Sequence, residues 1–307
     1  MVRMASTNPT GVPVTIPQDV LDMLRRIFGA GNAEVSNMLS RQPMSREDHL
    51  DQALITYLDK QSPEVAPHSG WIVDCETHFL GNGRHFGVWE IADIGVLIIL
   101  RRGDTVVWSK VAVLQSKRLF PLGSVHDEDA ERARFRWGFG RLHGSYDVSA
   151  VRRTYNFTEE STYASLDLYA DQARRIDAYQ GEMTIPVHYL LYNPLQLPWS
   201  RTLPVAGPAP LGSNDVGCRI VRARQMFTLR NVVAVPRYSD LRDISAPHAH
   251  APFLAGWRLE DFIVALLLGC HEGKVLDASL DNAMELLFYR RTGPISAAFA
   301  VNIWIAE

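Results

Sequence analysis

Cysteine and lysine are both scarce in this chain of 307 residues. Its three cysteines, Cys75, Cys218 and Cys270, lie far apart, so no spacing indicates a disulfide framework or a zinc site. We therefore expect a reducing, cytoplasmic setting. Only four of the 31 basic residues are lysines. A lysine that falls within a motif is consequently hard to explain as one of many surface amines.

Long apolar segments and nucleotide-binding loops are also missing. The longest apolar run, Phe262 to Cys270, is too short to span a bilayer, and the polar stretch Met1 to Thr10 lacks the apolar core of a signal peptide. No membrane association is expected. The chain contains no Gly-x-x-x-x-Gly-Lys-Ser/Thr loop and no Gly-x-Ser-x-Gly turn, which argues against ATP-driven and serine-hydrolase chemistry.

What the composition does contain is the material for a sizeable core. Hydrophobic residues make up 47% of the chain and charged residues 21%, as in a soluble globular protein of one large or two modest domains. The net charge of −3 argues against a protein that coats nucleic acid non-specifically. A localised positive groove stays compatible with this charge because basic residues can gather on one face.

Two apolar runs in the first half of the chain predict a β-hairpin. Ala92 to Leu100 and Val106 to Lys117 have strand length, and the polar turn Arg101 to Asp104 joins them. Because side chains alternate along a strand, Gln115 and Lys117 share one face. Asp93 at the start of the first strand can therefore converge with them.

These residue types suit metal-assisted hydrolysis of a phosphodiester. Asp93, the side-chain oxygen of Gln115 and the backbone carbonyl of Ser116 are hard oxygen ligands, which favour Mg²⁺ or Mn²⁺. Lys117 would lie beside the attacking water and offset the charge that develops on the phosphate. The pattern thus predicts a metal site formed by Asp93, Gln115 and Ser116, with Lys117 as the basic group.

The residues Asp93 and Gln115-Ser116-Lys117 resemble the motif of the PD-(D/E)xK restriction-endonuclease-like superfamily. The match is to the variant that has Gln in place of the second acid. This variant is found in Mrr-like nucleases and in nuclease effectors of antiphage defence. The resemblance implies an α/β fold with a restriction-endonuclease-like core, a mixed central sheet flanked by helices. It also implies a metal-dependent endodeoxyribonuclease acting in antiviral defence. Ala92 stands where the family usually has Pro.

The same resemblance implies a catalytic acid on the helix that precedes the hairpin. Glu47 in the stretch Met44 to Lys60 lies one turn before Leu50 on the apolar stripe, and Asp51 is its competitor. Glu76 and Glu90 are alternative metal ligands.

A segment rich in arginine and aromatic residues is the candidate DNA-binding surface. Arginine and aromatic side chains together suit phosphate contact and base stacking. The residues expected to contact DNA are Arg132, Arg134, Arg136, Arg141, Arg152 and Arg153. The alternative is a solvated face with a few buried aromatic residues.

Three regions are expected along the chain. Residues 1–42 form an N-terminal arm with one helix, Pro17 to Gly29, which could contact a partner protein or a second copy. Residues 43–200 form the nuclease-like core, with a helix over Ser161 to Gln180 and a strand over Met183 to Pro194. Residues 201–307 form a C-terminal elaboration packed on the core. It is expected to be rich in strands from Gly217 to Val235 and to contain helices over Leu259 to Gly269 and Leu280 to Tyr289. A strand over Ile295 to Ile305 is expected to follow.

Two rival functions remain open at this stage. One is a catalytically silent module of the same fold that binds nucleic acid or scaffolds a partner. The other is a protein that does not bind nucleic acid, in which Asp93 and Lys117 form an internal ion pair.

Overall fold

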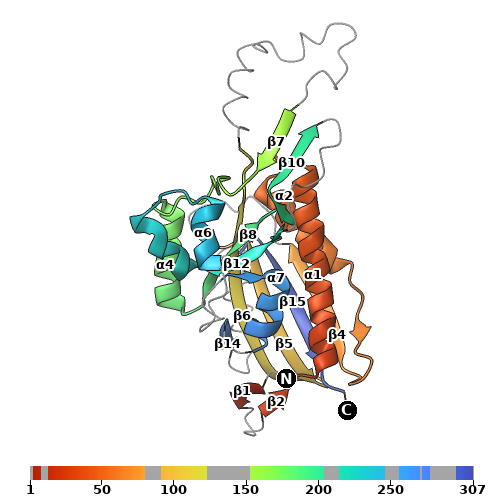
Figure 1. Ribbon diagram of the computed structural model, residues 1–307. Coiled ribbons are helices and arrows are strands. Elements are labelled where there is room, and N and C mark those ends of the chain that lie inside the picture. The colour runs from red at the N-terminus through yellow and green to blue at the C-terminus, as the bar shows by residue number, and fades with distance from the viewer. Residues whose placement is uncertain are drawn as a thin grey trace.

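A large mixed sheet forms the centre of the molecule (Figure 1). The computed structural model describes residues 3–7, 13–79, 91–122, 153–203, 214–245, 256–269, 272–276 and 295–306. The order of the strands across the sheet is β13 (Trp257–Arg258), β12 (Arg219–Arg222), β8 (Val187–Tyr192), β6 (Thr105–Arg118), β5 (Ile94–Arg102), β15 (Ala297–Trp304), β4 (Ile72–Phe79) and β3 (Glu64–Val65), with β14 (Lys274–Leu276) paired to β6. The pairs β6–β8 and β5–β15 are parallel and the others antiparallel. The expected α/β class with a mixed, helix-flanked sheet is confirmed at this level.

The predicted hairpin is confirmed. Strands β5 and β6 pair antiparallel from Ile94 opposite Leu114 to Arg102 opposite Thr105. Gly103 in the turn has a positive φ of 55°, a conformation that residues with a Cβ rarely adopt. The first seven residues of β5 are all buried, which explains why this strand reads as a continuous apolar run.

Helices cover both faces of the sheet. His188 packs edge-on against Phe262 of the π-helix η4 (Phe262–Leu267), whereas the next residue, Tyr189, packs against Phe227 of α5 (Ala223–Phe227). Because consecutive strand residues point to opposite faces, η4 and α5 lie on opposite sides. Helices α1 (Gln18–Arg41), α2 (Glu47–Asp59) and α7 (Leu259–Asp261) lie with η4, and α4 (Asp171–Met183) lies with α5.

Helix α1 is longer than the sequence indicated. We expected it to end at Gly29, but it continues to Arg41, so the predicted end is wrong. Gly31 allows α1 and α2 to pack closely, because a Cβ there would lie 3.2 Å from the Tyr57 ring and 3.3 Å from Leu54 of α2. The apolar face then continues through Val35 and Leu39, both fully buried. Burial of that face outweighs the low helix propensity of glycine.

Two further boundaries differ from the expectation. The helix expected over Ser161 to Gln180 begins only at Asp171, since the preceding residues form turns and an isolated bridge. The region expected to be strand-rich contains β12 but then turns into α5, the 3₁₀ helix η3 (Thr228–Asn231) and α6 (Tyr238–Ser245). The strand expected before Pro194 is confirmed as β8.

The C-terminal strand lies inside the sheet. We expected residues 201–307 to form an addition packed on the core, yet β15 pairs with β4 on one side and β5 on the other. The predicted helix Leu280 to Tyr289 lies outside the described residues.

The remaining strands form smaller two-stranded sheets. They are β1 (Arg3–Thr7) with β2 (Pro13–Thr15), β7 (Arg153–Phe157) with β10 (Trp199–Leu203), and β9 (Gln196–Leu197) with β11 (Asn214–Asp215). Strands β7 and β10 form a ribbon that extends beyond the main sheet (Figure 1). In the described part of the chain, no helix has the length and apolar character needed to cross a bilayer.

Candidate functional site

Asp93 and Gln115 meet at the end of the central hairpin. The backbone N–H of Asp93 donates to Leu114 at 2.9 Å, which holds Asp93 in the ladder just before β5. Its carboxylate oxygen Oδ2 accepts a hydrogen bond from the Gln115 amide and another, at 2.6 Å, from the backbone N–H of Ser116. The hairpin register therefore fixes both residues in contact.

The Gln115 amide is left half satisfied by this arrangement. The residue is only 2% exposed, and its oxygen Oε1 is buried without a hydrogen-bond donor among the described residues. An unpaired buried acceptor costs about 1–3 kcal/mol. Oε1 is therefore available to a cation or a water molecule.

Lys117 and Glu47 form the second contact of the site. Lys117 is 5% exposed, and its Nζ lies 3.9 Å from Oε2 of Glu47, the first residue of α2. The other Glu47 oxygen accepts hydrogen bonds from the backbone N–H of Arg118, at 2.9 Å, and from the Ser165 hydroxyl. Glu47 is thus held at the end of β6, and its side chain is partly exposed rather than fully buried.

Asp51 lies on the opposite face of β6 from Gln115 and Lys117. Its carboxylate accepts hydrogen bonds from the hydroxyl groups of Ser116 and Tyr192. Burial raises the pKa of Asp51 to about 7; the two hydrogen bonds oppose this shift, and the nearby acidic residues Glu47 and Asp48 add to it. Asp51 therefore anchors α2 to the sheet, and the ion pair with Lys117 belongs to Glu47.

A hollow of about 620 Å³ opens over this end of the sheet. Glu47, Asp51 and Asp93 contribute acidic groups to its lining, and Arg46 and Arg118 contribute basic ones. Arg118 is held in place, because it donates to the carbonyl of Pro43 and stacks 3.6 Å above the centre of the Phe120 ring. Burial lowers the pKa of Arg118 to about 10, against the opposing charge of Glu47.

The other predicted residues fall in different places. Arg132, Arg134, Arg136, Arg141 and Arg152 lie outside the described residues, as does Glu90. The backbone of Arg153 begins β7. Glu76 is exposed on β4, three residues along the strand from Phe79, which lines the hollow.

Sequence reasoning missed the supporting contacts of the site. Ser165 and Tyr192 touch Glu47 and Asp51, but they come from segments more than 110 residues away along the chain. No local pattern marks them. The only signal for Tyr192 is its place near the end of a buried strand.

The oxygen donors of the site are compatible with a divalent cation. Within the described ranges, no three His, Cys, Asp or Glu side chains gather into a metal-binding group. The donors at the end of the hairpin are of another kind, since they combine the Asp93 carboxylate with the Gln115 amide oxygen and the Ser116 carbonyl. The unsatisfied Gln115 Oε1 fits such a donor set. In the present structure the amide nitrogen faces Asp93, so coordination by both residues requires a half-turn of the amide.

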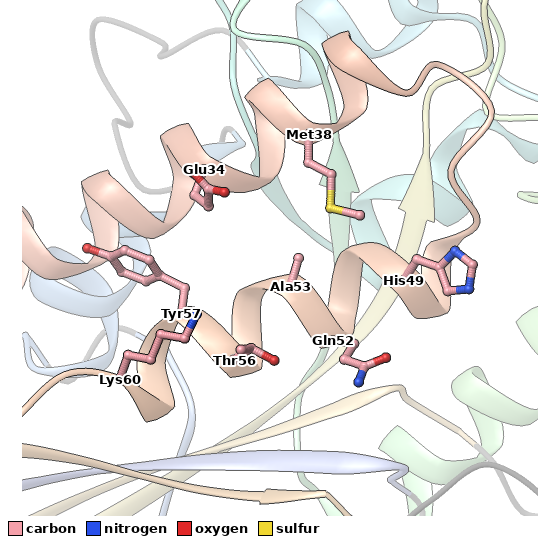
Figure 2. A pocket seen from close by; sticks show the side chains of 8 residues that line it. All are labelled: Glu34, Met38, His49, Gln52, Ala53, Thr56, Tyr57 and Lys60. Atoms are coloured by element: carbon pink, nitrogen blue, oxygen red, sulfur yellow. The ribbon is translucent and has the colours of Figure 1, made fainter.

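A second hollow, between α1 and α2, offers no comparable chemistry. Figure 2 shows Glu34 and Met38 from α1 facing a row of α2 side chains across it. The floor is formed by Met38, Ala53 and Tyr57, and the polar residues around them are exposed. Nothing in this lining resembles the paired contacts at the end of β6.

Comparison with protein-family models, curated protein sequences and solved structures gives no match. The function is therefore argued from the geometry of the site.

Proposed function

We propose that this protein is a nuclease that hydrolyses DNA phosphodiester bonds with the help of Mg²⁺ or Mn²⁺. One observation supports this proposal above the others. Asp93 and Gln115 are in contact, Glu47 and Lys117 form an ion pair, and Glu47 and Asp93 line the same hollow. These are the four residues that the motif singles out as catalytic.

The chain's own residues divide the work in this proposal. Asp93, Gln115 and the Ser116 carbonyl would hold the cation, which supplies Lewis acidity toward a phosphoryl oxygen when bound. Glu47 lines the hollow where a phosphate would bind and keeps the Lys117 ammonium at the end of β6, although Lys117 and Gln115 do not themselves line the hollow. The positive charge of Lys117 opposes the negative charge that develops on the phosphate in the transition state.

DNA is the proposed substrate and antiphage defence the proposed setting. Both extend from the resemblance of the Gln115-Ser116-Lys117 motif. The arginine-rich segment from Arg132 to Arg153 is the proposed source of phosphate contacts.

Cleavage of supercoiled plasmid DNA with Mg²⁺ or Mn²⁺ is the direct test. Lys117 is buried, so Lys117→Ala would also remove packing. Lys117→Met keeps most of the volume and removes the charge. We expect it to lower cleavage about 100-fold or more, the scale of one lost electrostatic contributor.

Lys60→Met is the matched control, because Lys60 is exposed and lies on the other hollow (Figure 2). It should cleave as the wild type does. Equal cleavage by the wild type and Lys117→Met would show that this motif is not the active site.

A catalytically silent module that binds nucleic acid is the second candidate. It is favoured by the amide nitrogen of Gln115, which already donates to Asp93 and closes that oxygen to a cation. This candidate predicts salt-dependent DNA binding without cleavage under either metal. If the protein neither binds nor cleaves DNA, the ion pair between Lys117 and Glu47 is a structural contact. This outcome would favour the third alternative, a protein that does not bind nucleic acid.

A further inference from the structure

A third hollow, of about 600 Å³, lies at the beginning of β8. This volume falls within the range of about 300–1,000 Å³ that is typical of small-molecule sites. Ile185, Pro186 and Val187 are the apolar residues of its lining, and Pro186 is the partly exposed one of the three. The rest of the lining comes from α4, α5, β12 and the stretch before β14, which contributes the acidic Glu272. The hollow therefore combines apolar residues with hydrogen-bonding and charged groups.

Two glutamines of this lining carry polar atoms that the protein does not satisfy. Gln180 is 6% exposed; its oxygen accepts from the Val187 N–H at 3.1 Å, but its nitrogen Nε2 has no acceptor among the described residues. The side-chain oxygen of Gln225 likewise has no donor there. Both glutamines line the hollow, and their unsatisfied atoms, one donor and one acceptor, are buried beside it. Such a pair matches a ligand with the opposite pair on one edge.

The hollow also carries positive charge. Arg222 forms an ion pair with the buried Glu272, so its charge is largely used within the protein. Arg224 is exposed on α5 and engages no acidic partner in the described part of the chain. A ligand that reached Arg224 would gain most from a phosphate or carboxylate group.

The rim includes a strained residue. Thr184 follows α4 with a φ of 55°, in the left-handed region that disfavours β-branched side chains. It is the one residue with a Cβ that adopts a positive φ in the described chain. Strain of this kind concentrates where a backbone shape serves binding.

We propose that this hollow binds a small anionic ligand with a planar, hydrogen-bonding ring, the chemistry of a nucleoside monophosphate. The ring packs on Pro186 and places its donor and acceptor edge against Gln180 and Gln225, while the phosphate contacts Arg224. Because the two unsatisfied atoms are buried, binding includes a small movement of the glutamine side chains.

This site is separate from the candidate nuclease site. It borders Val187, the first residue of β8, whereas the Tyr192 hydroxyl that bonds to Asp51 comes from the last residue of the same strand. The proposal therefore does not depend on nuclease activity.

Calorimetric titration of the full chain with each of the four common nucleoside 5′-monophosphates tests the proposal, with ribose 5-phosphate and inorganic phosphate as comparison ligands. At least one nucleotide should bind at least about tenfold more tightly than either comparison ligand. Arg224→Ala and Gln225→Ala should each weaken binding about tenfold, the effect of one lost polar contact. Arg102→Ala, which removes an exposed arginine at the hairpin turn, should leave the affinity unchanged.

Hydrogen exchange locates the bound ligand independently of affinity. Peptides covering residues 180–187 and 222–228 should exchange more slowly with the nucleotide present. The proposal is overturned if no nucleotide binds at millimolar concentration. It is equally overturned if inorganic phosphate binds as tightly, or if neither variant changes the affinity.

Discussion

Gln115 is the residue at which the metal hypothesis can be tested without any activity assay. Its amide nitrogen contacts Asp93 in a nearly closed environment. Gln115→Glu would place two carboxylates in contact, and their repulsion should lower the free energy of unfolding by about 1–3 kcal/mol. A cation bound between them would restore this loss, because ligands that bind only the folded state stabilise it.

Thermal unfolding with and without millimolar Mn²⁺ measures this effect. The midpoint of Gln115→Glu should rise with Mn²⁺ by more than that of the wild type. Gln52→Glu, an exposed change on α2, is the control and should respond as the wild type does. A Gln115→Glu protein that is indifferent to Mn²⁺, Mg²⁺ and Ca²⁺ would argue against a cation at this position.

Glu47 and Asp51 lie one helical turn apart, and the structure assigns them different tasks. Glu47→Gln keeps an oxygen for the Arg118 N–H but removes the charge that faces Lys117. We expect cleavage to fall about 100-fold. The free energy of unfolding should also fall, by about 1–3 kcal/mol, because the buried Lys117 ammonium loses its charged partner. Asp51→Ala leaves two buried hydroxyl groups without their acceptor, so we expect a loss of about 2–4 kcal/mol.

Urea denaturation and plasmid cleavage by the folded fraction separate these two effects. If Asp51→Ala is as stable as the wild type but inactive, the catalytic acid is Asp51.

At the scale of single elements, the end of α4 is the clearest point of strain. Thr184 adopts the left-handed conformation that glycine usually supplies after a helix. Thr184→Gly should therefore raise the free energy of unfolding by about 0.5–1 kcal/mol, net of the greater chain entropy of glycine.

Gly103→Ala provides the opposite case. The φ of Gly103 is positive and the space around it is open, so conformational strain alone should lower the free energy of unfolding by about 1 kcal/mol. Chemical denaturation measures the free energy of unfolding of both variants. If the two substitutions changed it in the same direction, this account would be contradicted.

Glu272 joins three elements through its carboxylate and its backbone carbonyl. Its carboxylate contacts His188 of β8 and Arg222 of β12, and its carbonyl accepts from the buried Lys110 of β6. Burial alone would raise the pKa of Glu272, but hydrogen bonds and charges from His188 and Arg222 outweigh burial and lower it below the ordinary value of 4.5. A lowered pKa means that the carboxylate stabilises the fold above pH 4.5 and loses this effect as the pH falls through the folded-state pKa.

In Glu272→Gln, the free energy of unfolding should therefore fall less steeply with decreasing pH below pH 4.5 than it does in the wild type. Urea unfolding at a series of acidic pH values measures it. Parallel curves for the wild type and the variant would assign the acid sensitivity to other carboxylates.

The elements also show what the sequence can and cannot reveal. Strands β5 and β6 were predictable because an apolar run, a polar turn and a second run are all local, and alternation then placed Gln115 and Lys117 on one face. The end of α1 was not predictable from the sequence. Gly31 lies within this helix because the absence of a Cβ lets α1 pack closely against Leu54 and Tyr57 of α2, and no local pattern shows that contact. The pairing of Asp51 with Tyr192 joins residues 141 positions apart, and no local periodicity records such a contact.

For the whole molecule, the principal difference concerns the last strand. Periodicity identified a strand near Ile295 to Ile305, and β15 occupies Ala297–Trp304. The position of that strand in the sheet is a property of topology. Because β15 hydrogen-bonds to both β4 and β5, it joins the edge of the sheet to the hairpin that carries Asp93. The backbone N–H groups of Ser296 and Ala297 also donate to the Asp93 carbonyl, so the chain's end helps to position the site.

This topology predicts that residues 43–200 do not fold alone. Without β15 the sheet is interrupted between β4 and β5, and the buried side chains of Phe299, Val301 and Ile303 are lost. Each buried side chain of this size contributes about 1.5–3 kcal/mol, so their loss of about 5–9 kcal/mol is comparable to the whole stability of a typical protein. The fragment should show no cooperative thermal transition by circular dichroism. A fragment spanning residues 13–307, which keeps α1 and β15, should unfold cooperatively. Cooperative unfolding of the 43–200 fragment would instead show that the core is autonomous and that β15 is an addition to it.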